Sequence, residues 1–414
     1  MRRALYSLAL YLLLPWALLH LAWRARRQPD YLRHVGERFG IYPHNLPAGV
    51  IWIHAVSVGE TRAAEPLITA LQARHPGLRI LLSHGTPTGR QTGIELYGDR
   101  VARCYLPYDF AWAACRFLRR FRPVAGVFME TEIWPNLIES GARSAVPLYL
   151  VNARMSEKSA RGYRRIGGLM RDALAKLSGI GAQTQLDAQR LAALGATNAS
   201  ITGNLKFDRS APAGMLELGA TLRASFGAHR PVFLAASTRQ GEEALILDAL
   251  AGAEISGLLT VIVPRHPQRF DEVVTLARQR GYKVQRRSEN RPIDAGTGIV
   301  IGDSMGELFA YYAACDVAFV GGSLLPLGGQ NLLEACAVGR PVIVGPHTFN
   351  FDEATRGAIE AGAAMRVAGA PELCVALGQL LGDADRRGAM AAAGMRFTET
   401  HRGATAKTLD LLRW

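Results

Sequence analysis

VIWIHAVSVGE, at residues 50–60, is the stretch of sequence that decides the fold. Its first seven residues, Val50–Val56, are apolar except for His54, which is typical of a strand buried on both faces of a parallel sheet. A helical pattern, TRAAEPLITALQARHPG, begins directly after this stretch. A unit of strand, tight turn and helix predicts an α/β fold, with ligand-binding residues at the carboxyl end of the strand.

The same alternation recurs in both halves of the chain, and helical patterns, for example at about residues 306–314 and 331–338, separate the strands. The predicted strands are Val50–Val56, Leu78–Ser83, Pro123–Glu130 and Val146–Arg154 in the first half and Pro231–Ser237, Leu258–Val263, Gly298–Ser304, Cys315–Ser323 and Arg340–Pro346 in the second. A chain of 414 residues is too long for one core of ordinary size. We therefore expect two doubly wound, Rossmann-like domains.

Composition and turn signals predict the boundaries of these domains. The expected segments are an anchor with its basic flank at 1–27, a first Rossmann-like domain at 28–207, a linker at 208–230, a second Rossmann-like domain at 231–394 and a C-terminal helix packing across both domains at 395–414. The linker is inferred because residues 208–230 lack a strong strand signal and contain the turn-rich strings APAG and FGAHRP.

The N-terminal segment reads as a membrane anchor. Residues Ala4–Trp23 carry no formal charge, and as a helix they cover about 30 Å, the thickness of a bilayer's hydrocarbon core. The larger cluster of arginines follows this run, which predicts that the rest of the chain is cytoplasmic. We weighed a cleaved signal peptide, an interfacial helix and a buried soluble helix, and favour an uncleaved anchor because the run lacks a small-x-small site and is apolar on all faces.

The overall composition limits the function classes. With 49% hydrophobic and 20% charged residues the chain is globular rather than disordered. Its net charge of +13 points to an anionic partner, which could be a nucleic acid, a phospholipid or a phosphorylated substrate. The chain has neither a G-x-G-x-x-G fingerprint after its first strand nor a P-loop, and its five cysteines form no C-x-x-C pair and are expected to be reduced core residues.

Polar residues follow the predicted strands of the first half. Glu60, near the start of a helix, is placed to accept a proton from a hydroxyl, although a glutamate there also complements the helix dipole. Glu130 and Glu132 end another strand, and they could orient a sugar or hold a cationic side chain, or one of them could cap the following helix while the other is solvated. Lys206, at the domain boundary, could stabilise developing negative charge or simply be a surface lysine. His54 lies inside its strand and is expected to be a core histidine.

A basic segment follows the last of these strands. Between residues 154 and 171 there are six basic residues and one acid, Glu157. Such a segment could meet phosphate groups, or it could be a solvated helix face.

The second half of the chain has its own candidate ligand-binding residues after its predicted strands. Pro264 and Arg265 follow a strand, and the flanking prolines stiffen the turn that aims the arginine. Met305, Gly306 and Glu307 lie where another strand passes into a helix. A glycine-rich loop precedes Asn331, Leu332, Leu333 and Glu334, and we expect a helix N-terminus there that favours anions. The D-x-D at 383–385 lies in a late polar turn, so no metal site is indicated.

Taken in order, seven strings resemble those of the lipid A Kdo transferases, which transfer 3-deoxy-D-manno-octulosonic acid (Kdo). The strings are WIHAVSVGE, METEIWPN, VNARMSEKS, GNLKFD, VPRHPQRF, DSMGEL and GGQNLLEA, and the resemblance runs from the anchor to the last helix. It implies a GT-B glycosyltransferase fold with two domains facing a cleft. It also implies an inner-membrane protein with its catalytic domains on the cytoplasmic side, contacting inner membrane phospholipid.

The resemblance further implies transfer of Kdo from CMP-Kdo to a lipid A precursor, lipid IVA, with inversion and without a metal cofactor. It makes the 28–207 domain the acceptor domain and the 231–394 domain the donor domain. Glu60 matches the proton acceptor, and Glu130 and Lys206 match residues that stabilise the transition state. The CMP-binding residues would be Pro264, Arg265, Met305, Gly306, Glu307, Asn331, Leu332, Leu333 and Glu334.

Two other functions remain open from the residues alone. A GT-B transferase or epimerase that uses a UDP-sugar would have similar glycine-rich loops. A membrane-tethered nucleic-acid binder would suit the net charge, but no known RNA- or DNA-binding motif supports it, and we expect no nucleic acid as a partner.

Overall fold

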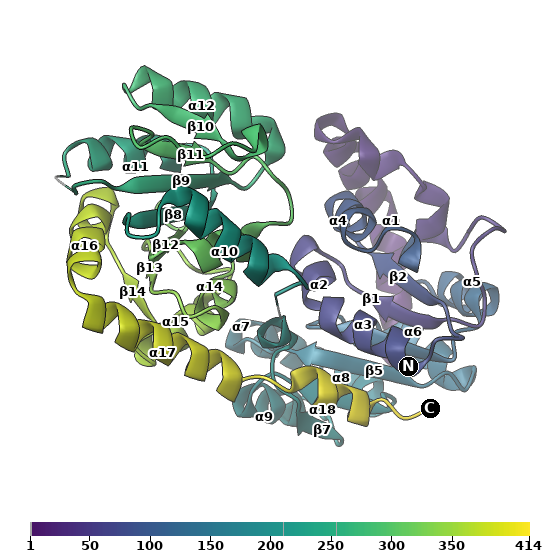
Figure 1. Ribbon diagram of the computed structural model, residues 1–414. Helices are drawn as coiled ribbons and strands as arrows, with labels where there is room; N and C mark the ends of the chain where they lie inside the picture. Colours follow the sequence, from purple (N-terminus) through teal and green to yellow (C-terminus); the bar gives the residue numbers. More distant parts are fainter. Residues whose placement is uncertain (1, 210, 254) are drawn as a thin grey trace. The chain divides into compact units, whose positions relative to one another are not determined.

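The computed structural model describes residues 2–209, 211–253 and 255–414. The chain divides into two compact units (Figure 1). Unit 1 comprises residues 1–208 and 401–414, and unit 2 comprises residues 209–400.

Unit 1 is built on a seven-stranded sheet in which every neighbouring pair is parallel. Its strand order is β3-β2-β1-β4-β5-β6-β7. The strands are β1 (Ile51–His54), β2 (Ile80–His84), β3 (Val101–Tyr105), β4 (Ala125–Met129), β5 (Leu148–Ala153), β6 (Gly179–Ala182) and β7 (Ala199–Ile201). The first strand lies in the interior of the sheet, as its unbroken apolar pattern predicted, and all four of its residues are buried.

Helices cover both faces of this sheet, because alternate residues of each strand point to opposite faces. Trp52 and Phe128 belong to one apolar core, whereas Ile53 and Val127 belong to the other. The helices of unit 1 are α1 (Arg2–Arg27), α2 (Val58–Ala63), α3 (Glu65–Arg74), α4 (Pro87–Tyr97), α5 (Ala111–Phe121), α6 (Pro135–Arg143), α7 (Glu157–Arg164), α8 (Gly167–Leu174), α9 (Gln185–Ala193) and α18 (Ala404–Leu411).

Unit 2 repeats this design with a sheet in the order β10-β11-β9-β8-β12-β13-β14, again parallel throughout. Its strands are β8 (Val232–Thr238), β9 (Leu259–Pro264), β10 (Val284–Arg286), β11 (Ile299–Ile301), β12 (Val317–Val320), β13 (Val342–Val344) and β14 (Ala364–Arg366). Its helices are α10 (Met215–Phe226), α11 (Glu242–Ala251), α12 (Phe270–Gln279), α13 (Leu308–Ala314), α14 (Leu333–Ala337), α15 (Asp352–Glu360), α16 (Ala370–Gly382) and α17 (Ala384–Thr400).

Two stretches differ from the expected organisation. The stretch expected to be a linker, 208–230, contains α10, which belongs to unit 2 and packs against α13. Its contact face includes Gly219, which lies so close to Ala310 and Ala313 that a larger side chain would collide with them. The single C-terminal helix expected at 395–414 is two helices, α17 in unit 2 and α18 in unit 1.

The strand order of each unit reverses between two neighbouring strands. This reversal lies between β1 and β4 in unit 1 and between β8 and β12 in unit 2. In open parallel sheets, ligands bind outside the carboxyl ends of the strands at such a point. The functional residues should therefore lie in the loops that follow β1 and β4 in unit 1 and β8 and β12 in unit 2.

Candidate active site

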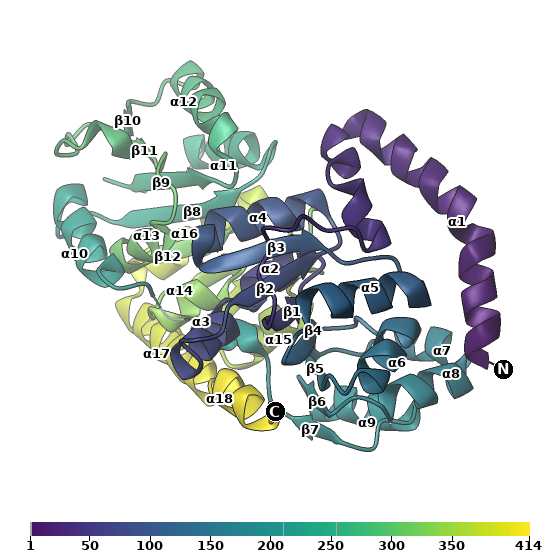
Figure 2. The same cartoon turned by 90° about the vertical axis from the view of Figure 1, so that its right-hand side faces the viewer.

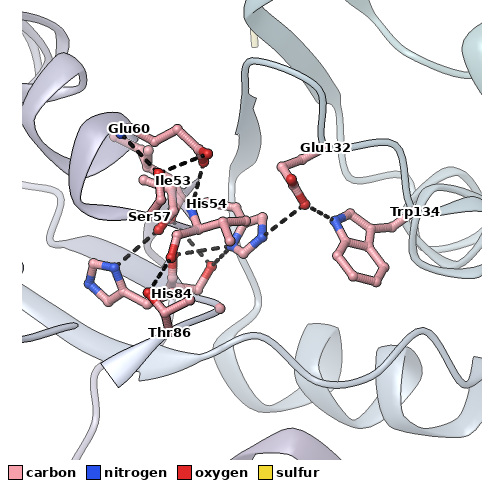
Figure 3. A network of polar contacts seen from close by, with 12 residues as sticks. Ile53, His54, Ser57, Glu60, His84, Thr86, Glu132 and Trp134 are labelled. Atoms are coloured by element: carbon pink, nitrogen blue, oxygen red, sulfur yellow. Dashed lines mark hydrogen bonds and ion pairs between the residues drawn. The ribbon is translucent and has the colours of Figure 1, made fainter. Parts of the chain in front are cut away.

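Glu60 lies in the first turn of α2, directly after β1. Ser57 caps this helix, because its Oγ accepts a hydrogen bond from the Glu60 N–H. The Glu60 carboxylate in turn accepts hydrogen bonds from the Val56 N–H at 2.6 Å and from the Ser57 hydroxyl at 3.2 Å (Figure 3). The string SVGE thus forms a reciprocal cap that fixes the carboxylate at the carboxyl end of β1.

The Glu60 carboxyl is also an unusually weak acid. Its pKa is raised to about 8, chiefly by burial and also by the negative charges of Glu130 and Glu132. The hydrogen bonds from Val56 and Ser57 act in the opposite direction. A carboxylate whose pKa lies near neutrality is suited to accept a proton from a hydroxyl group.

Glu130 follows β4 on the other side of the reversal point. Its φ angle is +57°, in the left-handed region that few non-glycine residues adopt, and such strain is common at functional sites. Its N–H still donates to the carbonyl oxygen of Val151 on β5. Its carboxylate forms an ion pair with Lys206, with 3.3 Å between Nζ and Oε1.

A set of amide side chains holds the loop that carries Lys206. Asn204 Oδ1 accepts the Lys206 N–H, and Asn204 donates to the side chain of Gln183. Gln183 donates to the backbone of Asn152, whose own Oδ1 accepts the N–H of Leu205. Asn152 has a φ angle of +50°. The segment GNLKFD is therefore fastened to the carboxyl ends of β5 and β6.

Glu132 connects two aromatic side chains of the site. Its Oε2 accepts a hydrogen bond from the Trp134 indole at 2.8 Å and lies 3.7 Å from Nε2 of His54 (Figure 3). His54 is fully buried, and its Nδ1 contacts Ser83. The prediction that His54 is a core histidine is therefore confirmed, whereas its contact with Glu132 could not be foreseen from sequence spacing.

A second buried imidazole, His84, lies beside α2 near Thr61. Its pKa is lowered to about 3, chiefly by burial and also by the neighbouring His54. His84 is therefore neutral at physiological pH and contributes no charge next to Glu60.

In unit 2, Pro264 ends β9 and Arg265 follows it. The Arg265 N–H donates to the carbonyl oxygen of Thr238, which ends β8. This bond holds the arginine at the carboxyl end of the two strands, beside the point where the strand order reverses.

The second predicted group of unit 2 precedes α13. Gly306 has a φ angle of +82°, and Met305 is 61% exposed. The Glu307 carboxylate accepts a hydrogen bond from the Ser304 hydroxyl at 2.6 Å and pairs with Arg287. The exposed methionine and the fixed carboxylate lie in the loop that follows β11.

The glycine-rich loop after β12 is held by a buried carboxylate that sequence analysis missed. Glu242, the first residue of α11, accepts hydrogen bonds from the N–H groups of Arg239, Gly322 and Leu324. Burial raises its pKa, and these three hydrogen bonds oppose the shift. A signal existed in the sequence, because the glutamate follows a strand and a Gly241 turn just as Glu60 follows a strand and Gly59.

The third predicted group of unit 2 differs from expectation in its local structure. The helix expected at residues 331–338 has only five residues, α14, so it is too short to provide a strong dipole at its N-terminus. Leu332 and Leu333 are buried. Glu334 is only 7% exposed, accepts a hydrogen bond from Asn331 and pairs with Arg209 at the start of unit 2.

The predicted residues thus form two groups. Glu60, Glu130 and Lys206 lie together in unit 1. The predicted CMP-binding residues all lie in unit 2, at the end of β9, in the segments that follow β9, β11 and β12, and at the start of α14. Among the residues that the structure describes, no group of three or more His, Cys, Asp or Glu side chains is arranged to hold a metal ion.

Comparison with known proteins assigns the chain to a family. Residues 33–209 match the family model of the 3-deoxy-D-manno-octulosonic-acid transferases. The 3-deoxy-D-manno-octulosonic acid transferase of Bordetella pertussis is 44% identical, with an alignment that covers 100% of this chain and 99% of that protein. The chain belongs to the Kdo transferase family. The Haemophilus influenzae member is 37% identical, with 100% and 98% covered.

The fold of this Kdo transferase family member agrees with that of a solved glycosyltransferase from Rickettsia africae. The two are 12% identical, with a TM-score of 0.56 over 89% of this chain and 98% of that one. At this identity the likeness concerns the fold alone. The chain is a glycosyltransferase with the GT-B fold, which confirms the predicted fold class and enzyme class.

Proposed function

We propose that this chain transfers Kdo from CMP-Kdo to a lipid A precursor, with lipid IVA as the acceptor and with inversion at the anomeric carbon. One observation carries the proposal beyond family membership. The Glu60 carboxyl, with its pKa raised to about 8, lies beside the Glu130–Lys206 ion pair at the reversal point of unit 1. This arrangement provides a base and a cation where a sugar hydroxyl would react.

In the proposed reaction, Glu60 takes the proton of the acceptor hydroxyl as its oxygen attacks the anomeric carbon of Kdo. The new carbon–oxygen bond forms while the bond to the CMP phosphate oxygen breaks, and CMP leaves with the electron pair. The transition state carries positive charge on the sugar ring and negative charge on the leaving phosphate. Lys206 and Glu130 stabilise this charge separation, and the ion pair keeps both groups at fixed positions.

CMP would bind in unit 2. Arg265 suits the phosphate, because an arginine held at a strand end is a good partner for its oxygens. Asn331 and Glu334 suit the ribose hydroxyls, although the Glu334 carboxylate forms an ion pair with Arg209 in this structure. Leu332 and Leu333 are buried, so they would contact CMP through their backbone atoms rather than their side chains. Two other segments would line the site, with Pro264 in one and Met305, Gly306 and Glu307 in the other.

Charge and hydropathy support the proposed acceptor and location. α1 has the length and composition of a membrane anchor. The basic side chains at α7, among them Lys158, Arg161 and Arg165, are exposed. A phosphorylated glycolipid would place its acyl chains in the inner membrane and its sugar near unit 1, with both units on the cytoplasmic side. We propose that no metal cofactor takes part and that nucleic acid is not a partner.

The proposal is tested by incubating the protein with CMP-Kdo and a tetraacylated lipid A precursor and weighing the lipid product by mass spectrometry. The expected product is heavier by one or more Kdo units, in equal yield with and without a chelator. Loss of activity with the chelator would contradict the metal-independent reaction. Equilibrium binding should favour CMP over UDP, and a preference for UDP would count against the donor.

A further inference from the structure

The helix α1 has two distinct faces along its whole length. Side chains at positions 3, 7, 10, 14, 17, 21 and 25 are buried or half-buried, a spacing that defines one face of a helix. The opposite face is exposed and apolar. Its residues, each between 50% and 72% exposed, are Leu5, Leu8, Leu12, Trp16, Leu19 and Trp23, which we call the outer stripe.

The N-terminal half of α1 makes specific polar contacts with unit 1. Arg3 pairs with Glu139 on α6 at 2.6 Å. The Tyr6 hydroxyl donates to Asp109, a carboxylate that also accepts backbone N–H groups at the start of α6. Further contacts join Ser7 to Asn136 and the ring of Tyr11 to that of Phe110.

The C-terminal end of α1 contacts the same unit. Leu21 and Ala25 pack against Tyr31, and the Arg24 guanidinium lies over the Tyr31 ring. The chain then passes to Glu37, which accepts the N–H of Tyr105 on β3, and to Arg38, which donates to a carbonyl oxygen before α4. In Figure 2, α1 arches beside unit 1, with its N-terminal end near α8.

These contacts bear on how the helix meets a bilayer. A helix of 26 residues is about 39 Å long, so a spanning α1 would place Arg3 and Trp23 in opposite headgroup layers. Arg3, Tyr6 and Ser7, however, bond to polar side chains of the unit that carries Glu60. In a spanning orientation those partners would have to enter the hydrocarbon, where ionised side chains are costly.

We propose that α1 does not cross the membrane but lies in the plane of the cytoplasmic leaflet, with its outer stripe among the acyl chains of an acidic phospholipid surface. The proposal rests on the proposed membrane attachment and is independent of the donor sugar. Its inner face contacts unit 1 near both ends of the helix, which explains why the helix is apolar nearly all round although it lies flat.

The charges at both ends of α1 suit an anionic leaflet. Arg2 at one end and Arg24 and Arg26 at the other are exposed. The helix α8 contacts both α1 and α7, so the exposed cations of α7 lie on the same side of unit 1 as the N-terminal end of α1. Basic groups at both ends of a flat apolar helix bind acidic headgroups, whereas a spanning helix would have one of its ends in the opposite leaflet.

A first test is a cross-link in the full-length protein in native membranes, with Ser7→Cys and Asn136→Cys in a Cys115→Ser background. The other four cysteines, Cys104, Cys315, Cys336 and Cys374, are buried. Mild oxidation should join the two new cysteines within one chain in most molecules, and neither single variant should give this product. Absence of the cross-link in membrane-bound protein that retains transferase activity would overturn the proposal.

A second test maps the two ends of the helix with an impermeant maleimide, using Arg2→Cys and Arg26→Cys separately. In sealed vesicles, both positions should react only from the cytoplasmic face. Reaction of position 2 from the opposite face alone would show a spanning helix and overturn the proposal. Recovery of the full-length chain in the soluble fraction would overturn membrane attachment itself, and the mass-spectrometric assay for Kdo transfer would still report separately on the enzyme.

Discussion

Glu60 in unit 1 and Glu242 in unit 2 occupy comparable positions but differ in their hydrogen bonds and in their expected roles. Each lies in the first turn of the helix that follows the first strand of its sheet, and burial raises the pKa of each carboxyl. Glu242 accepts three backbone N–H groups and joins two loops of unit 2. Glu60 accepts only one, from Val56, and a hydroxyl.

The difference shows how one scaffold separates a structural carboxylate from a reactive one. Glu242 accepts three backbone hydrogen bonds that oppose the effect of burial on its pKa, and its removal would leave buried donors without partners. Glu60 lies close to the acidic side chains of Glu130 and Glu132, so its negative charge is disfavoured and a proton is held more tightly. The following changes are expected to separate these two roles.

Replacing Glu60 should have the largest effect on the chemical step. Glu60→Ala is expected to lower the turnover of Kdo transfer by about 10²–10⁴-fold, because the acceptor hydroxyl loses its base. CMP binding, measured by calorimetry, should be unchanged. The matched control is Glu95→Ala on the exposed face of α4, which should keep normal turnover. Near-normal turnover of the Glu60 variant would refute its role.

Replacing Glu242 should have the largest effect on stability. Glu242→Ala leaves three backbone donors unpaired, and we expect it to destabilise unit 2 by about 3–5 kcal/mol and to abolish CMP binding. Thermal unfolding followed by calorimetry measures this loss. Glu353→Ala, on the exposed surface of α15, is the control and should unfold like the parent protein. A stable Glu242 variant would show that other contacts hold the glycine-rich loop.

Replacing Lys206 or Glu130 should lower kcat by a smaller factor, and the effects of the two replacements should not be additive. Lys206→Met is expected to lower kcat by about 10²-fold, since a fixed cation near the developing charge is lost. Glu130→Gln in the same background should add little, because the two groups act as one unit. Independent, fully additive losses in this double-mutant cycle would contradict the pairing.

The smallest expected effect concerns pH. Because Glu60 must be ionised to accept a proton, kcat/KM should rise with pH up to about 8 and level off above it. Glu132→Gln removes a negative charge that raises the pKa of Glu60, so the rise should move to lower pH, by less than about one pH unit. Glu157→Gln, on exposed α7, should leave the profile in place. A shift to higher pH in the Glu132 variant would contradict the electrostatic account.

Much of the fold followed from the sequence because interior strands carry continuous apolar runs. The strands at the sheet edges were not predicted. β3 contains Arg103 in its centre, β10 reads VQR and β14 reads AMR, and edge strands tolerate such residues because one side meets solvent. β6, with the sequence GIGA, was missed although it is interior, because its two glycines weaken the strand pattern.

The candidate residues could be located from the sequence, but their environments could not. Strand ends place Glu60 and Glu130 at the same edge, so their proximity was foreseeable. Glu130 and Asn152 adopt the left-handed backbone conformation, which the sequence did not indicate because neither residue is a glycine. The hydrogen bond between Asn152 and Leu205 joins residues that are 53 positions apart in the sequence. The pKa of Glu60 depends on such distant contacts, and local patterns do not encode them.

The way α1 is attached also has a practical consequence for making this protein. As far as the described residues show, the two large apolar cores of unit 1 contain no side chain of α1, and the helix contributes only Leu21 and Ala25 to a small separate cluster. Asp109 keeps its backbone partners at the start of α6 without Tyr6. A shortened version that begins after residue 27 should therefore be obtainable without detergent, as a reagent for crystallisation and inhibitor screening.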